Sequence, residues 1–408
     1  MRRWLVRGII AVPVSLLFLF SPHEPYGNNK IYLATHNYAF SFFGWEARNF
    51  PQKWLALVRK PFSQSLAPQE QDALVNRYFT LGNEANKVAG QIREIAAKSS
   101  SSQGKGELEH RLEALRAERE SLRTRVEEIL EDRLTQLLTS QKLGMPTPFG
   151  PLLFPPVDLV MERLPKILVV SPRDRIELTD SVFIRSEMAV EEMERLEKAV
   201  ESQNLSALVD NIGGVSSYPA TVPDNANLRF IISTISHEWL HHYFFFQPLG
   251  MRYWRSYDMA IINETAADIA GEELADLILE KYGAAWGEEG AGQRPSRRNA
   301  APADSPFRRD MRRVRLKVDE LLREGKIGEA EQFMEDARIY LGQKGYYIRK
   351  LNQAYFAFYG SYATGAASSS PIGGELQRLR ERSTSVGQFV KRVSAVTSHQ
   401  QLKELIKG

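Results

Sequence analysis

The sequence has no cysteine in its 408 residues. Disulfide bonds, thiolate nucleophiles and cysteine-ligated metal sites are therefore excluded, which leaves histidine and carboxylate side chains as metal ligands. Histidine is itself scarce, with seven in the whole chain. A large excess of one charge is also missing, because 53 Lys and Arg stand against 50 Asp and Glu, a net charge of +3. This balance gives no strongly basic surface, and no nucleic-acid partner is predicted.

The composition that is present is that of an ordinary globular protein, with 43% hydrophobic and 25% charged residues. This excludes a wholly disordered or collagen-like chain, and the length allows two or three structural units. Long stretches with helical periodicity are interrupted by a few short β-branched runs. We therefore predict an α+β fold that is predominantly helical, with a small sheet.

The N-terminus combines positive charge with an apolar run. Three arginines within the first seven residues precede residues 8–20, which carry no charge. Such a run matches the core of an export signal, and extension back to Trp4 gives about 17 residues, the lower limit for a membrane span. Because no small-residue cleavage site follows, residues 1–22 predict a single-pass membrane anchor, with a cytoplasmic N-terminus and an extracytoplasmic remainder. Secretion after signal cleavage and a buried N-terminal helix are the alternatives.

Residues 23–66 are rich in aromatic side chains, eight of which lie between Ile31 and Trp54. Aromatic density just beyond a membrane anchor is typical of an interfacial belt, which predicts a juxtamembrane segment in contact with the membrane. Packing of the same side chains in the protein core explains the pattern equally well.

Residues 67–143 show the pattern of a helical hairpin. Helical periodicity extends from Pro68 to about Lys98, and the serine-rich residues 99–106 form a polar turn. In the second helix apolar residues recur every seven positions, at Leu108, Leu115, Leu122 and Ile129. Two antiparallel helices are the simplest interpretation, and a coiled coil that forms a homo-oligomer through this hairpin is the alternative.

Residues 144–286 are predicted to form the core domain. Five prolines in residues 144–156 mark its start, and short β-branched runs predict strands near residues 167–170, 181–185, 205–209 and 215–221. Residues 287–306 lack periodicity and are rich in Gly, Ala, Pro and Arg, which predicts a flexible loop. Residues 307–408 are predicted to be helical, with a Gly/Ser/Ala-rich connection at residues 360–374.

A helix that starts near Asn225 is apolar on nearly every side and contains an H-E-x-x-H motif, His237-Glu238-Trp239-Leu240-His241. Residues i and i+4 lie about 40° apart around a helix axis, so both imidazoles can converge on one zinc ion. Glu238 is placed to reach a water on that ion. Two core histidines satisfied by ordinary hydrogen bonds are the alternative, but burying these groups costs several kcal/mol unless a metal or partners satisfy them.

The third ligand is predicted to be acidic. A histidine at the position found in metzincins is missing, because Phe244 and Gln247 occupy the diagnostic positions. A second helix near residues 259–281 contains Asn263-Glu264 and, four residues after the glutamate, Asp268. Glu264 and Asp268 share a face, so Glu264 can bind the metal while Asp268 orients a ligand histidine. Small residues on this helix would allow close approach to its neighbour: Ala266, Ala267, Ala270 and Gly271.

These two motifs together resemble those of the gluzincin zinc metallopeptidases, the thermolysin-like clan, whose pattern is H-E-x-x-H followed by N-E-x-x-x-D. The resemblance covers residues 225–274 and implies a gluzincin-like core that hydrolyses peptide bonds. It implies a zinc cofactor held by His237, His241 and Glu264, with Glu238 as general base and Asp268 as hydrogen-bond partner of a ligand.

Further candidate site residues lie outside the two motifs. Gluzincins commonly stabilise the tetrahedral oxyanion with a Tyr or His from a more C-terminal helix, and Tyr355 and Tyr359 are candidates because they share a helix face. Gly213, Gly214 and Val215 are candidates for an edge strand that binds an extended peptide, since glycines allow close backbone approach. An ordinary turn before a strand is the alternative for these three.

The sequence thus predicts a membrane-anchored zinc metallopeptidase that acts on peptide or protein substrates. The alternative is a membrane-tethered scaffold or pseudoenzyme, with a structural zinc site and a helical hairpin that binds partners. Structural zinc sites usually close with four protein ligands, often cysteines, whereas this chain offers three and no cysteine. The presence of Glu238, which binds no metal, also favours the enzyme.

Overall fold

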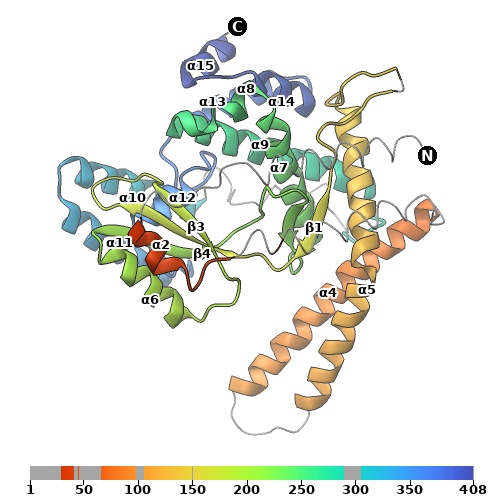
Figure 1. Ribbon diagram of the computed structural model, residues 1–408, viewed down its shortest axis with the longest axis horizontal. Coiled ribbons are helices and arrows are strands. Elements are labelled where there is room, and N and C mark those ends of the chain that lie inside the picture. Colours follow the sequence, from red (N-terminus) through yellow and green to blue (C-terminus); the bar gives the residue numbers. More distant parts are fainter. Residues whose placement is uncertain are drawn as a thin grey trace.

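The computed structural model describes residues 29–40, 45, 66–97, 105–148, 150–288 and 305–407. Within these ranges the protein is a mixed α+β structure and mostly helical, as predicted (Figure 1). Its α-helices are α2 (Asn29–Thr35), α4 (Pro68–Ala97), α5 (Lys105–Ser140), α6 (Val190–Glu201), α7 (Leu228–Phe245), α8 (Pro248–Met251), α9 (Tyr257–Tyr282), α10 (Pro306–Arg323), α11 (Ile327–Gln343), α12 (Gln353–Tyr359), α13 (Ile372–Glu381), α14 (Val386–Ser394) and α15 (His399–Lys407). A 3₁₀ turn, η2 (Tyr253–Arg255), lies between α8 and α9.

The strands form two small sheets. One is antiparallel in the order β3 (Asp180–Ile184), β2 (Lys166–Pro172), β4 (Leu205–Asn211), and the other pairs β1 (Leu159–Glu162) with β5 (Ala220–Pro223) in parallel. The predicted strands near residues 167–170, 181–185 and 205–209 are confirmed as β2, β3 and β4. The predicted strand at residues 215–221 is wrong in its bounds, because the chain turns between an isolated bridge at Val215 and the strand β5. Strand β1 was not foreseen.

Side chains close the outer edge of β4. The Val209 N–H donates to the carboxylate of Glu197 on α6 at 2.6 Å, and its carbonyl accepts from Arg349 at 2.6 Å. The carbonyl of Ala207, two residues earlier on the same edge, accepts from the Asn352 amide at 2.9 Å. These groups satisfy backbone positions that a neighbouring strand would otherwise bind.

Helix α5 closes the outer edge of β1 in the same manner. The N–H groups of Leu159 and Met161 donate to Glu131 at 3.1 Å and to Glu127 at 2.8 Å. The carbonyl of Met161 accepts from Arg123 at 3.2 Å. The three helix side chains are spaced by four residues, so one face of α5 matches the alternation of the strand.

Short pieces of backbone cover the two remaining edges. The Phe40 N–H donates to the Phe183 carbonyl of β3, and the N–H of Arg185, just after β3, donates to the Tyr38 carbonyl, each at 2.8 Å. On β5, Val215 exchanges two backbone hydrogen bonds with Thr221, at 2.9 and 3.0 Å. Each outer strand of the described sheets is therefore covered.

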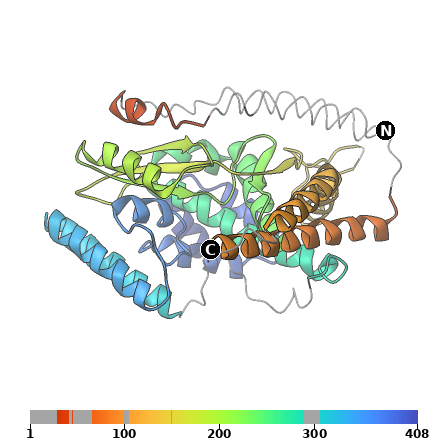
Figure 2. The same ribbon diagram turned by 90° about the horizontal axis from the view of Figure 1, so that it is seen from below.

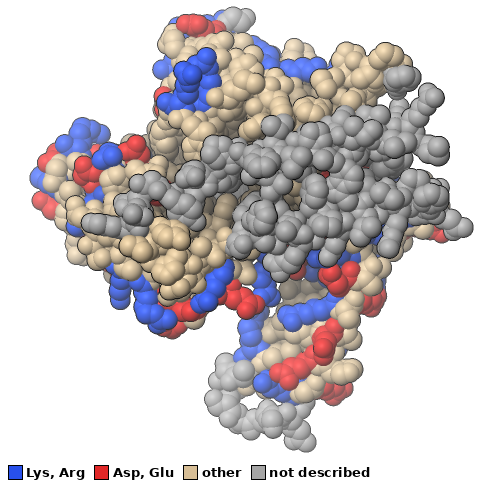
Figure 3. Space-filling model, viewed as in Figure 1, with Lys and Arg blue, Asp and Glu red and all other residues tan. Residues whose placement is uncertain are grey.

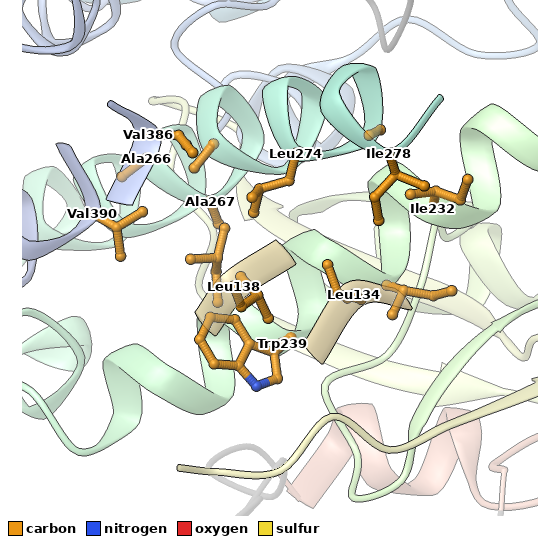
Figure 4. Close-up of a cluster of buried hydrophobic side chains, with 14 of the residues drawn as sticks. Leu134, Leu138, Ile232, Trp239, Ala266, Ala267, Leu274, Ile278, Val386 and Val390 are labelled. Carbon is orange, nitrogen blue, oxygen red and sulfur yellow. The ribbon is translucent and has the colours of Figure 1, made fainter. Parts of the chain in front are cut away.

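The helices α4 and α5 form the predicted antiparallel hairpin, which projects from the body of the protein (Figures 1 and 2). Basic and acidic side chains alternate over its surface, in keeping with the small net charge (Figure 3). The half of the hairpin nearest the body is not a separate unit. Leu134 and Leu138 belong to the same hydrophobic cluster as Trp239 of α7 and the alanines of α9 (Figure 4). In the outer half Leu108 and Leu115 are only partly buried.

The C-terminal part is helical, as predicted. Helices α10 and α11 pack on one another around a second hydrophobic cluster, and α12 packs on β2 and β4. Helices α13, α14 and α15 contact α9 and complete the main core. Most of the predicted loop at residues 287–306 lies outside the described residues, and α10 starts at its end.

The predicted transmembrane topology and membrane location are corrected. Among the helices that the structure describes, none combines the length and the apolar composition needed to cross a bilayer. The segment on which the anchor was placed, residues 1–22, lies outside the described residues. In the aromatic-rich segment, the indole of Trp45 is buried and donates to Glu162, and Ile31 packs with the β2 cluster. For the aromatic Trp45 the core-packing alternative holds, whereas Tyr32 is exposed.

Candidate metal centre

Helix α7 carries two histidines into the core. It begins after Asn227, whose side chain accepts a hydrogen bond from the Phe230 N–H at 2.9 Å and so caps the first turn. Apolar residues on nearly every side hold it between the hairpin and α9. His237 and His241 lie one turn apart on the face that meets α9, with ring centroids 4.6 Å apart.

Helix α9 approaches α7 closely, as its small residues predict. It is capped by Ser256, and Ala266, Ala267 and Ala270 are fully buried. At Gly271 an added Cβ would lie 3.1 Å from the carbonyl oxygen of Ser233 on α7. It would also lie 3.3 Å from the His237 Cβ, so the glycine sets the distance between the two helices beside the first histidine.

The close packing brings Glu264 of α9 to the two imidazoles. Its Oε2 lies 3.6 Å from His237 Nε2 and 3.5 Å from His241 Nε2, and the two Nε2 atoms are 2.9 Å apart. Zinc bound tetrahedrally at about 2.0–2.2 Å would space its ligand atoms about 3.3 Å apart. The observed triangle brackets that value, and the residues therefore fit a metal ion.

The second ring nitrogen of His241 is held by the residue before Glu264. His241 Nδ1 lies 2.8 Å from Oδ1 of Asn263, which accepts its proton and leaves Nε2 as the ligand atom. His237 Nδ1 is buried without a hydrogen-bond partner in the described structure. The site is partly open to solvent, since the side chains of His241 and Glu264 are 15% and 13% exposed, against 3% for His237.

Electrostatics favour a bound cation at this point. Burial alone lowers the pKa of His241, but the charge and hydrogen bond of Glu264 outweigh it and raise the pKa to about 9. Burial raises the pKa of Glu264, yet the two imidazoles hold it well below its usual value. The carboxylate of Glu264 thus favours positive charge at His241, and a divalent cation bound there would replace the proton.

Glu238 lies on the next face of α7, under the segment 211–219, which we call the strap. Its Oε2 accepts a hydrogen bond from the Ser216 hydroxyl. A Cβ on Gly214 would collide with the Glu238 carboxylate and lie 2.6 Å from Thr234 Cγ2. The glycine backbone therefore lies close to Glu238, whereas the predicted approach was that of a bound peptide. Val215, the third predicted residue, uses its N–H and carbonyl to bond Thr221.

Asp268, one turn after Glu264, lies at the connection between α12 and α13. Its Oδ2 accepts from the Thr364 hydroxyl at 3.0 Å. The neighbouring Thr265 accepts from the Ala363 N–H at 2.9 Å. These bonds fix the Gly/Ser/Ala-rich connection against α9, and they place the ring of Tyr362 with its centroid 6.2 Å from that of His237.

The two tyrosines predicted as oxyanion donors are directed elsewhere. The Tyr359 hydroxyl donates to Asp210 at the end of β4, at 3.0 Å. The Tyr355 ring packs on Tyr359 and on the clusters around α10 and β2. The i, i+4 spacing of Tyr355 and Tyr359 showed that they share a helix face. It did not show that this face packs on strands β2 and β4. A different phenol reaches the triad, since the Tyr253 hydroxyl donates to Glu264 Oε1 at 2.8 Å.

Sequence reasoning therefore missed several residues of the site: Ser216, Tyr253, Asn263, Tyr362 and Thr364. Asn263 directly precedes the predicted ligand Glu264, and its amide oxygen could have been expected to accept a hydrogen bond from a ligand histidine. The others come from a strap, a 3₁₀ turn and a connection, whose positions depend on tertiary packing. Comparisons with protein-family models, curated proteins and solved structures return no match, so the residues and their geometry are the basis for a functional interpretation.

Proposed function

We propose that this protein is a zinc metallopeptidase with a gluzincin-like core. The observation that carries the proposal is the convergence of His237, His241 and Glu264 on one point, with the carboxylate of Glu238 on the adjacent face of the same helix. A site of two imidazoles and one carboxylate suits zinc, and three protein ligands leave a position for water or substrate, as catalytic zinc sites do. A purely structural site has no need of Glu238.

The protein groups around the site have separable roles. When bound, zinc supplies Lewis-acid chemistry, lowering the pKa of a water and polarising the scissile carbonyl. Glu238 accepts the proton of the attacking water and delivers it to the leaving amine. Asn263 orients His241 through Nδ1. Asp268, which was expected to hold a ligand histidine, accepts from Thr364 instead, and it fixes the connection that carries Tyr362 beside His237.

Two phenols lie next to the metal triad. Tyr253 contacts Glu264, and Tyr362 lies beside His237. Burial and the neighbouring Glu264 raise the pKa of Tyr253 well above its usual value, so its hydroxyl keeps the proton that a donor needs. These two replace Tyr355 and Tyr359 as our candidates.

An extended peptide would lie along Gly213 and Gly214 of the strap. Successive residues of an extended segment direct their backbone groups to opposite sides, and Val215 directs its own toward β5. The backbone groups of Gly214 are therefore directed away from β5, to the side on which a peptide would pair. Its Cα faces Glu238, whose carboxylate fills the space that a Cβ would need.

The test is hydrolysis by the full chain and by Glu238→Gln. Zinc content is measured after metal removal and reconstitution, and turnover is followed on β-casein and a mixture of quenched-fluorescence peptides. We expect about one zinc in both proteins and turnover reduced about 100-fold or more in the variant. Glu280→Gln, at an exposed position of α9, is the matched control and should be fully active. Zinc binding without hydrolysis by the natural sequence would overturn the proposal and favour a scaffold.

A further inference from the structure

Helix α7 presents a second pair of functional groups beside the metal-binding pair. Glu238 and His242 are separated by four residues, so they lie one above the other on a common face. Both contact the strap. Glu238 accepts the hydroxyl proton of Ser216, and the ring of His242 bonds to backbone groups of Ser216 and Ser217.

The strap is held in place independently of Glu238. Val215 pairs with Thr221, and the Tyr218 ring contacts the His242 ring at 5.4 Å while its hydroxyl donates to the Pro156 carbonyl at 3.2 Å. The strap backbone is therefore fixed on both sides of Ser216. A side chain on such a support has a defined position relative to α7.

The carboxylate of Glu238 is consequently confined by the strap from two directions. Oε1 occupies the place of a Cβ on Gly214, and the Ser216 hydroxyl is bonded to Oε2. An unrestrained glutamate side chain has several rotamers, so a general base on it would be misplaced for part of the time. The contacts remove that freedom.

We propose that Ser216 is a positioning residue, whose hydroxyl, bonded to Oε2, fixes the side-chain position of Glu238 on the helix that carries His237 and His241. This inference rests on the proposed function. The neighbouring Ser217 shows what a serine with a structural role looks like here. Its hydroxyl lies 2.7 Å from the Pro219 carbonyl and 2.9 Å from the Thr221 hydroxyl, within the strap itself.

The experiment compares Ser216→Ala with Ser217→Ala in the full chain loaded with zinc. Loss of positioning should lower kcat about 10- to 100-fold in Ser216→Ala, with KM within about twofold of the natural protein. Ser216→Thr restores the hydroxyl and should recover most of kcat. Ser217→Ala removes a hydroxyl of the same kind and should change the unfolding midpoint more than kcat.

A binding measurement separates positioning from turnover. Acetohydroxamate chelates zinc and offers a hydroxyl proton to a neighbouring carboxylate, so its calorimetric affinity should be about 3- to 10-fold weaker in Ser216→Ala with zinc content unchanged. An unchanged kcat and hydroxamate affinity in Ser216→Ala would overturn the role of Ser216 while leaving the peptidase intact. Failure of the natural protein to hydrolyse any peptide would instead defeat the proposed function.

Discussion

Two adjacent histidines on α7, His241 and His242, point to opposite environments. The ring of His241 faces Glu264 and Asn263 of α9, whereas the ring of His242 contacts backbone groups of the strap. Each belongs to a pair at i and i+4, with His237 and Glu238 respectively. Because consecutive residues are about 100° apart on a helix, the two pairs form separate faces, one with the geometry of a cation site and one that contacts the strap.

The two rings also show how a partner decides the charge of a buried histidine. Burial lowers the pKa of both. For His241 the carboxylate of Glu264 outweighs burial and raises the pKa to about 9. For His242 burial dominates, the charge of His241 adds to it, and the pKa falls to about 4. Neighbours in sequence thus differ in protonation at neutral pH because only one of them faces an acid.

Substitution of His241 should affect zinc binding, whereas substitution of His242 should affect stability. In His241→Ala we expect zinc affinity to fall at least about 100-fold, since one of three protein ligands is lost. His242→Phe keeps a ring against Tyr218 but loses the bonds to the strap. It should bind zinc normally while its free energy of unfolding drops by about 1–3 kcal/mol. Competition with a zinc chelator and denaturant unfolding measure the two effects. Equal loss of zinc in both variants would contradict the separation of the faces.

Asn263 supports the metal-binding pair by accepting the hydrogen bond of His241 Nδ1. Asn263→Ala removes the acceptor for His241 Nδ1, so the ring is no longer held with Nε2 toward the metal. Loss of such a partner typically weakens metal binding 10- to 100-fold, and we expect an effect in this range by chelator competition. The matched control is Asn225→Ala, at an exposed position before α7, which should bind zinc as the natural protein does.

The smallest effect is the change in zinc affinity per unit of pH. The raised pKa means that His241 keeps its proton below about pH 9 when no metal is bound, and zinc must displace that proton. Affinity should therefore fall about tenfold per unit as pH decreases below 9 and level off above it. Calorimetry in buffers of different ionisation enthalpy should show about one proton released per zinc at pH 7.5. His242, neutral already, should contribute none, and binding without proton release would show that His241 is not protonated.

The sequence allowed prediction of those elements whose signals are local. The apolar periodicity of α7 and α9, the heptads of α5 and the β-branched run of β2 each lie within the element they specify. Strand β1 was not predicted because four residues between prolines are too few to show a strand periodicity. The carboxylates that bond to its edge come from α5, about 30 residues earlier in the chain. The predicted membrane span was the main error among the elements.

The same distinction applies to the site. The i, i+4 spacing placed His237 and His241 on one face of α7, and the carboxylate of Glu264 lies on the neighbouring helix α9. The small residues of α9 explain how the two helices come close enough for the three side chains to meet. The phenols were misassigned because a shared helix face does not tell which neighbour it contacts, and that of Tyr359 meets Asp210. Ser216 had no signal, since its role depends on where the strap crosses α7.

The covered sheet edges have a consequence for the behaviour of the protein in concentrated solution. Bare strand edges are templates for intermolecular pairing, and many proteins protect them with bulges, charged side chains or a covering loop, or close the sheet into a barrel. Here Glu197, Arg349 and Asn352 on one sheet, and the α5 carboxylates on the other, occupy the same backbone groups from within the chain. The two described sheets, of three and two strands, thus offer few open backbone groups to a neighbouring molecule, and pairing through their edges is disfavoured without any enlargement of the fold.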